Sequence, residues 1–597
     1  MHRLSPFPLI REAWSSLRGS WARITGVMVG FHLLLLVIVS PLIGWLFREA
    51  LRANGMVALD INAVRITSGI GITILLLVAI LVLAFWVVSL QFATIVVMVH
   101  RARAGEPLTA RGVWQDLARA ARKLLRPSSL PLFFYLFFIV PLSGFGFVSA
   151  LSQGIAVPSF ISGELLKSPV SATVWILFLL LLAILNLRFS LSLPIFTLTP
   201  ATGGRALRRS WRLTGGWAAF RLILAVTLLL IAASIASLIL VLASIIPTAV
   251  SDAVSPASSP FVAAYSLGVA QVAGMALTGV FIAMVCAVLL ALMRQREDQQ
   301  PPEPRSDSER RPAWLLVGAG LVLAIALGTL SVNTMVNFAR QPATLVLGHR
   351  GFSDNGAENT IGGLEAAAAA GADLTEIDVM QTADEKFVVM HDANLARLTG
   401  ENLNVRDLTQ AELMQMTVTD QYGHTGKIPS LEEYVNRARE LDMPLLIEIK
   451  LGGLDTPDHV DQLVEELDRL DAIDSNIFHT LDAPSVERLK RLRPDATVGY
   501  ILAFAGIDIP STPADFVVVE EWSATEEMQR AAERKGLGFF SWTVNEEAGI
   551  RELLRRDVDG IITDHPDVAV DARAEMEGET GLAGSLADAL QRFVVVF

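Results

Sequence analysis

TLVLGHRGFSDNGAENTIGGLEAAAAAGADLTEIDVMQTADEKFVVMHD, residues 344–392, is the stretch that decides the fold of the C-terminal half. Its apolar runs 344–349 and 374–379 are typical of buried strands, and the alanine-rich segment 359–371 between them is typical of a helix. Both runs end in ionisable side chains. A strand, a helix and a second strand in this order predict parallel strands that are covered by helices.

The same alternation continues toward the C-terminus. Further strands are expected at 387–391, 445–449, 476–479, 497–502, 515–519, 538–543 and 560–563. Amphipathic helices are expected at 408–416, 430–442, 457–471, 483–492, 524–536 and 546–556. About eight such units over ~225 residues predict an α/β (β/α)8 barrel, the TIM-barrel fold. The alternative is an open doubly wound sheet, which the lack of a GxGxxG loop after the first strand disfavours.

Side chains that can do chemistry stand at the ends of five of the expected strands. They are His349 and Arg350, Glu376 and Asp378, His391 and Asp392, Glu448 and Lys450, and Trp542. A (β/α)8 barrel builds its active site at the carboxyl ends of its strands. Because packing does not explain five such ends, the sequence predicts an active site there.

Three carboxylates of this set could share a cation. Glu376 and Asp378 lie two residues apart on a strand, so both point to one face, and Glu448 can converge on them from another strand. Like charges this close repel unless something positive lies between them. Oxygen ligands suit one hard divalent cation, Mg²⁺ or Ca²⁺. The alternative is a salt-bridge cluster with Arg350 and Lys450.

Two histidines share the same expected mouth. The pKa of a histidine lies near neutrality, which suits general acid and base catalysis. His349 and His391 stand at separate strand ends, so we expect them to act as a pair. The remaining histidines of the acidic half lack this support from strand and motif position, and they are not part of the expected site: His424, His459, His479 and His565.

The rest of the chain has a different composition. Of the 597 residues, 52% are hydrophobic and 18% are charged, whereas about a quarter are charged in a soluble protein. Residues 1–340 contain 27 Lys and Arg against 12 Asp and Glu, and residues 341–597 contain 21 against 48. An apolar basic half joined to an acidic half predicts a membrane domain followed by a water-soluble domain. The acidic half argues against nucleic acid as a partner.

Seven apolar runs are long enough to span a lipid bilayer. The connections on one side of these runs contain 22 Lys and Arg, and those on the other side contain 4. The positive-inside rule places the N-terminus in the cytoplasm, and seven crossings then place the barrel on the extracytoplasmic side of the plasma (inner) membrane. The expected spans are 24–47, 68–99, 130–151, 170–192, 220–247, 261–293 and 313–336.

These patterns divide the chain into five parts. They are a six-span helical membrane domain at 1–293, a polar proline-rich cytoplasmic linker at 294–312, a seventh transmembrane helix at 313–336, the barrel at 341–570 and a tail at 571–597. The many spans leave open a transport or lipid-handling role with the barrel as an accessory. Against it, His32 is the only clear ionisable group inside a span, and ion or proton paths usually need such groups.

The chain resembles the glycerophosphodiester phosphodiesterase family in its membrane-anchored bacterial form. The resemblance rests on the ordered motifs HRG, ENT, EID, HD, EIK and WTVN between residues 349 and 545, and it covers about 344–570. ALRRSWRLTGG at 206–216, together with hydropathy, resembles the multi-span domain that some bacterial members carry. The stretch FHTLD at 478–482 departs from the family, which often has Ser-Phe-Asp there, and this leaves substrate preference open.

The resemblance implies hydrolysis of a glycerophosphodiester to glycerol 3-phosphate and an alcohol. It implies His349 and His391 as the catalytic pair. It implies a divalent cation on three ligands: Glu376, Asp378 and Glu448. It also implies that four residues bind the substrate and its phosphate: Arg350, Lys450, Asn359 and Trp542. Among these, Asn359 orients the site, and so does its neighbour Glu358. The alternative is hydrolysis of membrane lysophospholipids by a lysophospholipase D-type reaction.

Overall fold

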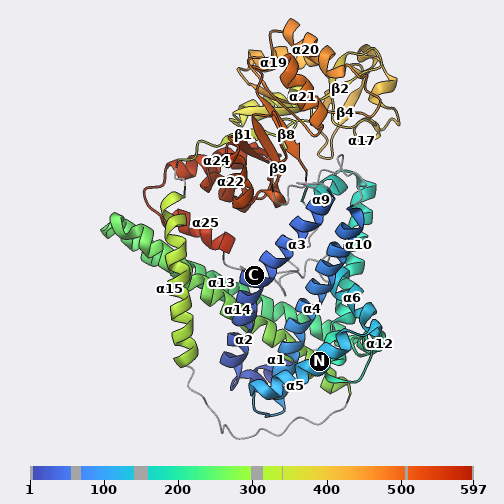
Figure 1. Cartoon of the computed structure of the whole chain (residues 1–597). Helices are drawn as coiled ribbons and strands as arrows, with labels where there is room; N and C mark the ends of the chain where they lie inside the picture. Colours follow the sequence, from blue (N-terminus) through green and yellow to red (C-terminus); the bar gives the residue numbers. More distant parts are fainter. Residues whose placement is uncertain are drawn as a thin grey trace.

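The computed structural model describes residues 5–54, 69–139, 159–297, 314–338, 341–503 and 508–593. A helical half and a barrel lie end to end, with the barrel beyond one end of the helices (Figure 1). The last helix returns from the barrel and packs against the helical half.

Long apolar helices make up the first half. Six described segments are long and apolar enough to cross a membrane: Trp21–Ala53, Ile70–Arg103, Pro169–Leu198, Trp217–Val254, Pro256–Arg296 and Trp314–Asn337. They contain α2 (Trp21–Leu34), α3 (Ser40–Ala53), α4 (Ile70–Arg103), α10 (Pro169–Phe189), α11 (Ser192–Leu198), α13 (Trp217–Val254), α14 (Ser259–Arg296) and α15 (Trp314–Asn337). These segments correspond to six of the seven expected spans. The other span, at 130–151, begins with the short apolar helix Pro127–Phe137 and continues outside the described residues, so the count of seven stays a prediction. Most of the expected linker also lies outside them.

Helix α14 forms the centre of the helical half. Of its most apolar stretch 67% is buried, against 11 to 17% in the other five segments. It packs against α13, α15, α2 and α1 (Phe7–Leu17). A Cβ added at Gly268 would lie 2.3 Å from the carbonyl oxygen of Ala324. The glycine therefore allows α14 and α15 to approach closely, as small residues do in membrane helix pairs.

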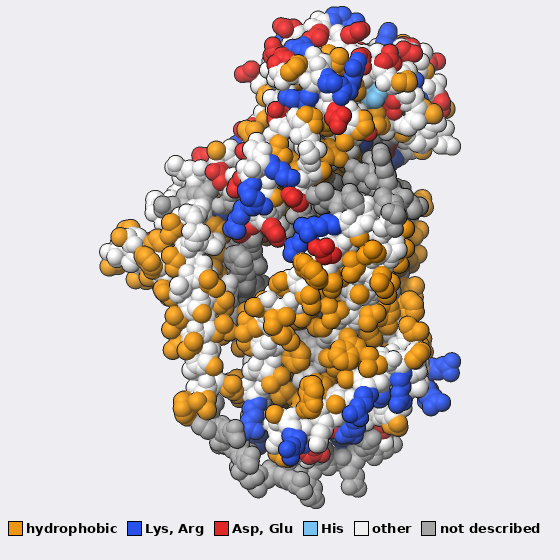
Figure 2. Space-filling model, in the orientation of Figure 1, with side chains coloured by type: hydrophobic (Ala, Val, Ile, Leu, Met, Phe, Trp, Pro, Cys, Tyr) orange, Lys and Arg blue, Asp and Glu red, His pale blue; other side chains and the backbone are white. Residues whose placement is uncertain are grey.

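The surface of the helical half has the pattern of a membrane protein. Figure 2 shows hydrophobic side chains around its middle and Lys and Arg side chains gathered at the end away from the barrel. The short arginine-bearing helices α5 (Ala110–Leu124) and α12 (Gly203–Leu213) lie at that end (Figure 1). An apolar belt bounded by basic residues is typical of a multi-pass membrane protein.

The second half is a closed barrel of eight parallel strands. Strand β1 pairs with β2 on one side and with β11 on the other, which closes the sheet. The strands are β1 (Leu345–Gly348), β2 (Leu374–Gln381), β6 (Leu445–Ile449), β7 (Ile477–Thr480), β8 (Val498–Leu502), β9 (Phe516–Glu520), β10 (Gly538–Trp542) and β11 (Gly560–Thr563). This closure confirms the (β/α)8 prediction and excludes the open doubly wound sheet.

Helices alternate with the strands as expected. They are α16 (Ile361–Ala369), α19 (Leu431–Glu440), α20 (His459–Arg469), α21 (Ala483–Leu492), α22 (Glu526–Arg534), α23 (Glu547–Arg555) and α24 (Pro566–Glu577). Several begin where a side chain accepts a hydrogen bond from a first-turn amide, as Thr360 and Ser430 do. The expected helix 408–416 is reduced to α18 (Gln410–Leu413), and α17 (Ala396–Thr399) and a hairpin of β4 (Thr417–Thr419) and β5 (Thr425–Lys427) lie beside it in the chain.

The sequence interpretation was wrong about the direction of one strand. The expected strand 387–391 is β3 (Phe387–Val389), which pairs antiparallel with β2 and is not one of the eight barrel strands. Therefore His391 and Asp392 do not follow the carboxyl end of a barrel strand. They reach the mouth because β3 folds back along β2, and the amide of Met390 donates to the carbonyl of Asp378 at 2.9 Å.

The C-terminal segment links the two halves. Helix α24 continues beyond residue 570, where the sequence predicted the end of the barrel. Helix α25 (Ala583–Phe593) packs on α13, α14 and the barrel helix α23. At its start, one carboxylate oxygen of Asp252 in α13 accepts hydrogen bonds from the amides of Leu582 and Ala583. Asp588 in α25 accepts from Arg551 and Arg555 of α23. The segment therefore connects the membrane-side helices to the barrel.

Candidate active site

A cavity of about 290 Å³ opens at the carboxyl ends of the barrel strands. Its lining contains seven of the nine residues expected at the site, namely His349, Arg350, Glu376, His391, Glu448, Lys450 and Trp542. Leu481, Ile501 and Ile562 add apolar side chains to its wall. The other two expected residues, Asn359 and Asp378, are buried behind this lining and hold its members in place.

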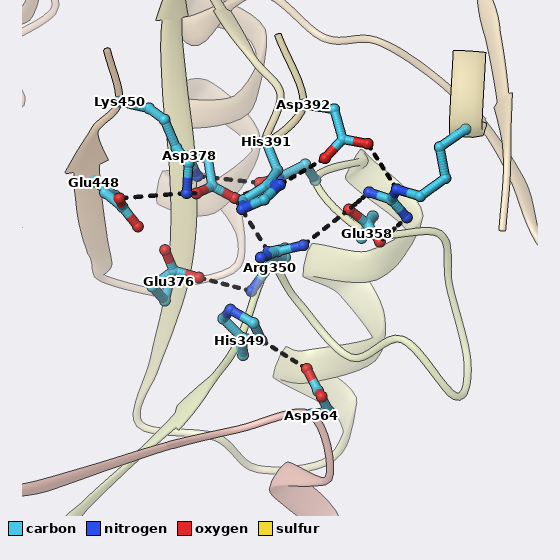
Figure 3. Close-up of polar contacts among 12 residues, drawn as sticks. His349, Arg350, Glu358, Glu376, Asp378, His391, Asp392, Glu448, Lys450 and Asp564 are labelled. Atoms are coloured by element: carbon cyan, nitrogen blue, oxygen red, sulfur yellow. Dashed lines mark hydrogen bonds and ion pairs between the residues drawn. The ribbon is translucent and has the colours of Figure 1, made fainter. Parts of the chain in front are cut away.

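Each of the two histidines is held by an aspartate. Nδ1 of His349 lies 2.7 Å from Oδ1 of Asp564, and Nδ1 of His391 lies 2.7 Å from Oδ1 of Asp392. Figure 3 shows the two histidines on either side of Arg350. A carboxylate at Nδ1 fixes the orientation of an imidazole ring and stabilises its protonated form, which leaves Nε2 for proton transfer. In both rings, Nε2 can therefore accept or donate a proton.

The aspartates of these pairs stay ionised. Burial would raise the pKa of Asp392, but hydrogen bonds from His391 and Arg397 outweigh it and lower the pKa to about 2. Burial would likewise raise the pKa of Asp564, yet the neighbouring His349 brings it well below its usual range. An ionised partner can accept the Nδ1 hydrogen bond of either histidine throughout the neutral pH range.

A network of charges continues from His391 into the wall of the barrel. Nε of Arg397 donates to Asp392 at 2.6 Å, and the rest of its guanidinium donates to both carboxylate oxygens of Glu358. Glu358 in turn accepts from Nη1 of Arg350 at 3.2 Å. Burial opposes the charge of Glu358, but Arg350 and Arg397 hold its pKa well below the usual range. The network therefore joins the second histidine to the arginine at the centre of the site.

Two residues of the HRG and ENT motifs adopt backbone conformations that are rare outside glycine. Arg350 has φ of 57° and Asn359 has φ of 56°. The amide of Arg350 donates to Glu376 at 2.9 Å, and the amide of Asn359 donates to the carbonyl of Arg350 at 2.9 Å. Left-handed backbone of this kind is kept where the surroundings determine it, commonly at functional sites. Here it turns a backbone donor toward a carboxylate of the site.

Asp378 is surrounded by donors and cations. Oδ2 accepts from the side-chain amide of Asn359 at 2.8 Å and lies 3.3 Å from Nε of Arg350. Oδ1 lies 3.0 Å from Nζ of Lys450, which also lies 3.4 Å from Glu448. Burial raises the pKa of Asp378, but Lys450 and the other neighbouring cations bring it well below its usual value. The structure therefore places Asp378 against both cations of the site.

Two carboxylates of the site lie close to a histidine that was not part of the site expected from the sequence. Ligand atoms of Glu376, Glu448 and His479 all lie within 4.8 Å of one another, and all three residues are buried. Among the described residues, neither ring nitrogen of His479 has a hydrogen-bond partner. A buried imidazole without a hydrogen bond beside two carboxylates fits a bound cation, because buried polar groups are otherwise hydrogen-bonded.

Strand register explains how His479 reaches this point. Asp378 on β2 is paired with Glu448 on β6, and Glu448 is paired with His479 on β7. Neighbours in register on parallel strands point to the same face, here into the barrel. The only signal in the sequence is the histidine in FHTLD, at the carboxyl end of an expected strand, and that signal becomes useful only once the pairing of the strands is known.

The closed barrel and the two His–Asp pairs over buried carboxylates define an enzyme of the TIM-barrel class. The model for the membrane domain of glycerophosphoryl diester phosphodiesterase matches residues 10–330, and the model for the glycerophosphoryl diester phosphodiesterase family matches residues 349–568. The first covers more than half of the chain. The chain belongs to the glycerophosphoryl diester phosphodiesterase family, in the form that carries a membrane domain, and it is an enzyme that hydrolyses glycerophosphodiesters.

Individual relatives match the barrel half. A glycerophosphodiester phosphodiesterase of Caldanaerobacter subterraneus is 29% identical over 237 residues, which are 38% of this chain and 96% of the relative. A lysophospholipase D of Rattus norvegicus is 27% identical over 263 residues, 37% of this chain and 83% of the relative. An Oleispira antarctica phosphodiesterase solved with the product sn-glycerol-3-phosphate aligns with 25% identity and a TM-score of 0.35, over 38% of this chain and 96% of that one.

Proposed function

We propose that this enzyme cleaves glycerophosphodiesters to glycerol 3-phosphate and an alcohol by general acid and base catalysis from His349 and His391, with one divalent cation. The observation that carries the proposal is that both histidines line one cavity, each with an ionised aspartate at Nδ1, together with Arg350, Lys450 and two carboxylates. A phosphodiester in this cavity would have a proton acceptor and a proton donor within the same lining.

The chemistry of the reaction assigns a task to each group. The phosphodiester is an anion, and its charge grows as the nucleophile attacks, so Arg350 and Lys450 would stabilise the transition state more than the substrate. One histidine would take a proton from the attacking hydroxyl, and the other would give a proton to the departing alkoxide. The attacking group is water or the neighbouring glycerol hydroxyl of the substrate. Trp542 would form part of the wall against the glycerol or the alcohol.

The proposed cation site consists of Glu376, Glu448 and His479. When bound there, the cation would supply positive charge to orient and polarise the phosphate. The two carboxylates suit Mg²⁺, Ca²⁺ or Mn²⁺. Asp378 remains a candidate ligand from the sequence. If it binds the cation, Asp378→Asn will raise the metal concentration needed for half-maximal activity; if it only holds Lys450, the same variant will raise KM instead.

We propose further that the barrel lies outside the plasma membrane. The basic end of the helical half is opposite the barrel (Figure 2), and basic residues are retained on the cytoplasmic side. A membrane-impermeant maleimide should therefore label a cysteine placed at exposed Tyr422 in intact cells. Labelling only after the cells are broken open would place the barrel in the cytoplasm.

A second candidate function is hydrolysis of lysophospholipids as a lysophospholipase D. It is favoured by the similarity to relatives of that name and by the position of the barrel beside membrane helices. Purified full-length protein would be given glycerophosphocholine and, separately, lysophosphatidylcholine, with and without EDTA, for wild type and His391→Ala.

The products of this assay separate the candidate functions. Metal-dependent release of glycerol 3-phosphate from glycerophosphocholine, lost in the variant, supports the first function. Choline release from the lysolipid alone supports the second. Turnover of neither would contradict both and would leave lipid handling by the membrane domain as the remaining alternative.

A further inference from the structure

The cavity of the barrel has a wall that comes from the membrane domain. Besides barrel residues, its lining contains Gly163 and Lys167. Gly163 belongs to α9 (Ser159–Leu166), and Lys167 follows directly, at the corner where α10 begins at Pro169. Helix α9 lies at the end of the membrane domain that faces the barrel (Figure 1). The corner between α9 and α10 is therefore placed at the mouth of the active site.

Lys167 is one of only two lysines in the first 340 residues, the other being Lys123. Its charge acts on two carboxylates beside the site. Burial would raise the pKa of Asp564, the partner of His349, and the charge of Lys167 is among those that lower it; the same holds for Glu358, the partner of Arg350. The ammonium group thus lies within electrostatic range of carboxylates behind the first histidine and the central arginine.

The charge balance of the cavity shows what Lys167 contributes. Among the described lining residues, the barrel supplies three carboxylates, Glu376, Glu448 and Asp564, and two cations, Arg350 and Lys450. Leaving aside the proposed divalent cation, the side chains of the barrel lining therefore carry one more negative than positive charge. Lys167 adds a third positively charged side chain to this lining, from the membrane domain.

We propose that Lys167 of the membrane domain binds the anionic phosphodiester of the substrate, so that the active site is built from both halves of the chain. The inference rests on the proposed function, because it concerns the same cavity. It assigns the membrane domain a direct part in substrate binding in addition to anchoring. A salt link to a buried or half-buried anion is worth roughly a tenfold change in affinity or more.

Kinetics of full-length Lys167 variants on glycerophosphocholine test this directly. We expect Lys167→Ala to raise KM about tenfold or more with a smaller change in kcat, Lys167→Glu to raise it further, and Lys167→Arg to stay near wild type. The matched control is Arg48→Ala. Arg48 is another cation of the membrane domain that faces the barrel, 4.0 Å from Glu527, and it does not line the cavity. Its removal should leave KM unchanged.

The outcomes separate this inference from the proposed function. An active wild type with unchanged KM in Lys167→Ala overturns the inference alone, and so does an equal rise in KM in the Arg48 control, because docking of the halves would then be the cause. An inactive wild type overturns the proposed function instead.

A second readout does not need turnover. In a Cys286→Ser background, maleimide labelling of the Lys167→Cys variant should be slowed by sn-glycerol 3-phosphate, and labelling of Arg48→Cys should not. Equal labelling of Lys167→Cys with and without glycerol 3-phosphate would overturn the inference by itself.

Discussion

Nε2 of His479 lies 3.6 Å from Oε1 of Glu376, and the two side chains are almost completely buried. They come from strands that are not neighbours, since β6 with Glu448 lies between β2 and β7. Three strands therefore direct two carboxylates and an imidazole to one point, and this arrangement leads to the first prediction.

His479 should be needed for metal binding. We expect His479→Gln to raise the metal concentration for half-maximal activity at least tenfold, with activity largely recovered at saturating metal, because one ligand is lost and the proposed catalytic histidines remain. The measurement is a metal titration with Mg²⁺, Ca²⁺ and Mn²⁺ after removal of metal by EDTA. His424→Ala serves as the control, since His424 pairs with Asp420 away from the cavity. Identical titration curves for His479→Gln and wild type would contradict the assignment.

Loss of either histidine of the proposed catalytic pair should reduce kcat strongly. Proton transfer by a positioned side chain contributes about 10²- to 10⁴-fold, so His349→Ala and His391→Ala should each lose activity in this range, with KM changed much less. Steady-state kinetics on glycerophosphocholine measures both parameters. If one variant keeps more than half of the wild-type kcat, that histidine is not the acid or the base.

Asp392 and Asp564 should affect kcat through the histidines to which they are hydrogen-bonded. Asp392→Asn and Asp564→Asn should lower kcat by a smaller factor than loss of the rings, and they should lower the apparent pKa of the pH–rate profile, because an ionised carboxylate stabilises a protonated imidazole. Asp420→Asn is a matched control, as Asp420 holds His424 at 2.9 Å. An unchanged pH profile in both variants would remove the aspartates from the mechanism.

A buried carboxyl at the end of β9 should make stability depend on pH. Burial raises the pKa of Glu520 from 4.5 to about 7. The folded state then binds a proton that the unfolded state releases, so stability falls as pH rises from about 4.5 through 7. Glu520→Gln should therefore raise the midpoint of thermal inactivation at pH 8 and change it little at pH 5. Exposed Glu527→Gln is the control, and an effect of the Glu520→Gln substitution that is equal at both pH values would argue against the raised pKa.

The contact between α25 and α23 should stabilise the chain. Arg555 is fully buried and donates to Asp588 at 2.7 Å and to Glu579 at 2.5 Å. Removing Asp588 takes one of two carboxylate partners from the buried guanidinium of Arg555, and the loss of a hydrogen bond to a charged group costs about 1.5–3 kcal/mol. Asp588→Ala should thus lower the midpoint of thermal inactivation by several degrees and expose α25 to proteolysis. Exposed Asp571→Ala should do neither; equal behaviour of the two variants would show that the pair contributes little.

The sequence was sufficient to predict the barrel and most of the side chains that line its cavity. Strands, helices and the strand-end positions of Glu376, Glu448 and Lys450 follow from hydrophobic pattern and motif order, because both depend on neighbours along the chain. The same reasoning placed His391 in the mouth but gave the wrong reason, since the direction of β3 depends on how the chain turns after β2. It missed His479 because a single histidine in a strand carries no signal until its register with Glu448 is known.

The amino-acid sequence by itself determined that this chain has an apolar basic half and a barrel with carboxylates, histidines and cations at its strand ends. Only the tertiary structure decided which of these side chains meet. Asp564 reaches His349 from 215 residues away along the chain, and His479 joins Glu376 across two strand boundaries. Lys167 comes to the cavity from the other half of the chain. Such contacts depend on strand register, chain reversal and the docking of the two halves, which short-range sequence patterns do not encode.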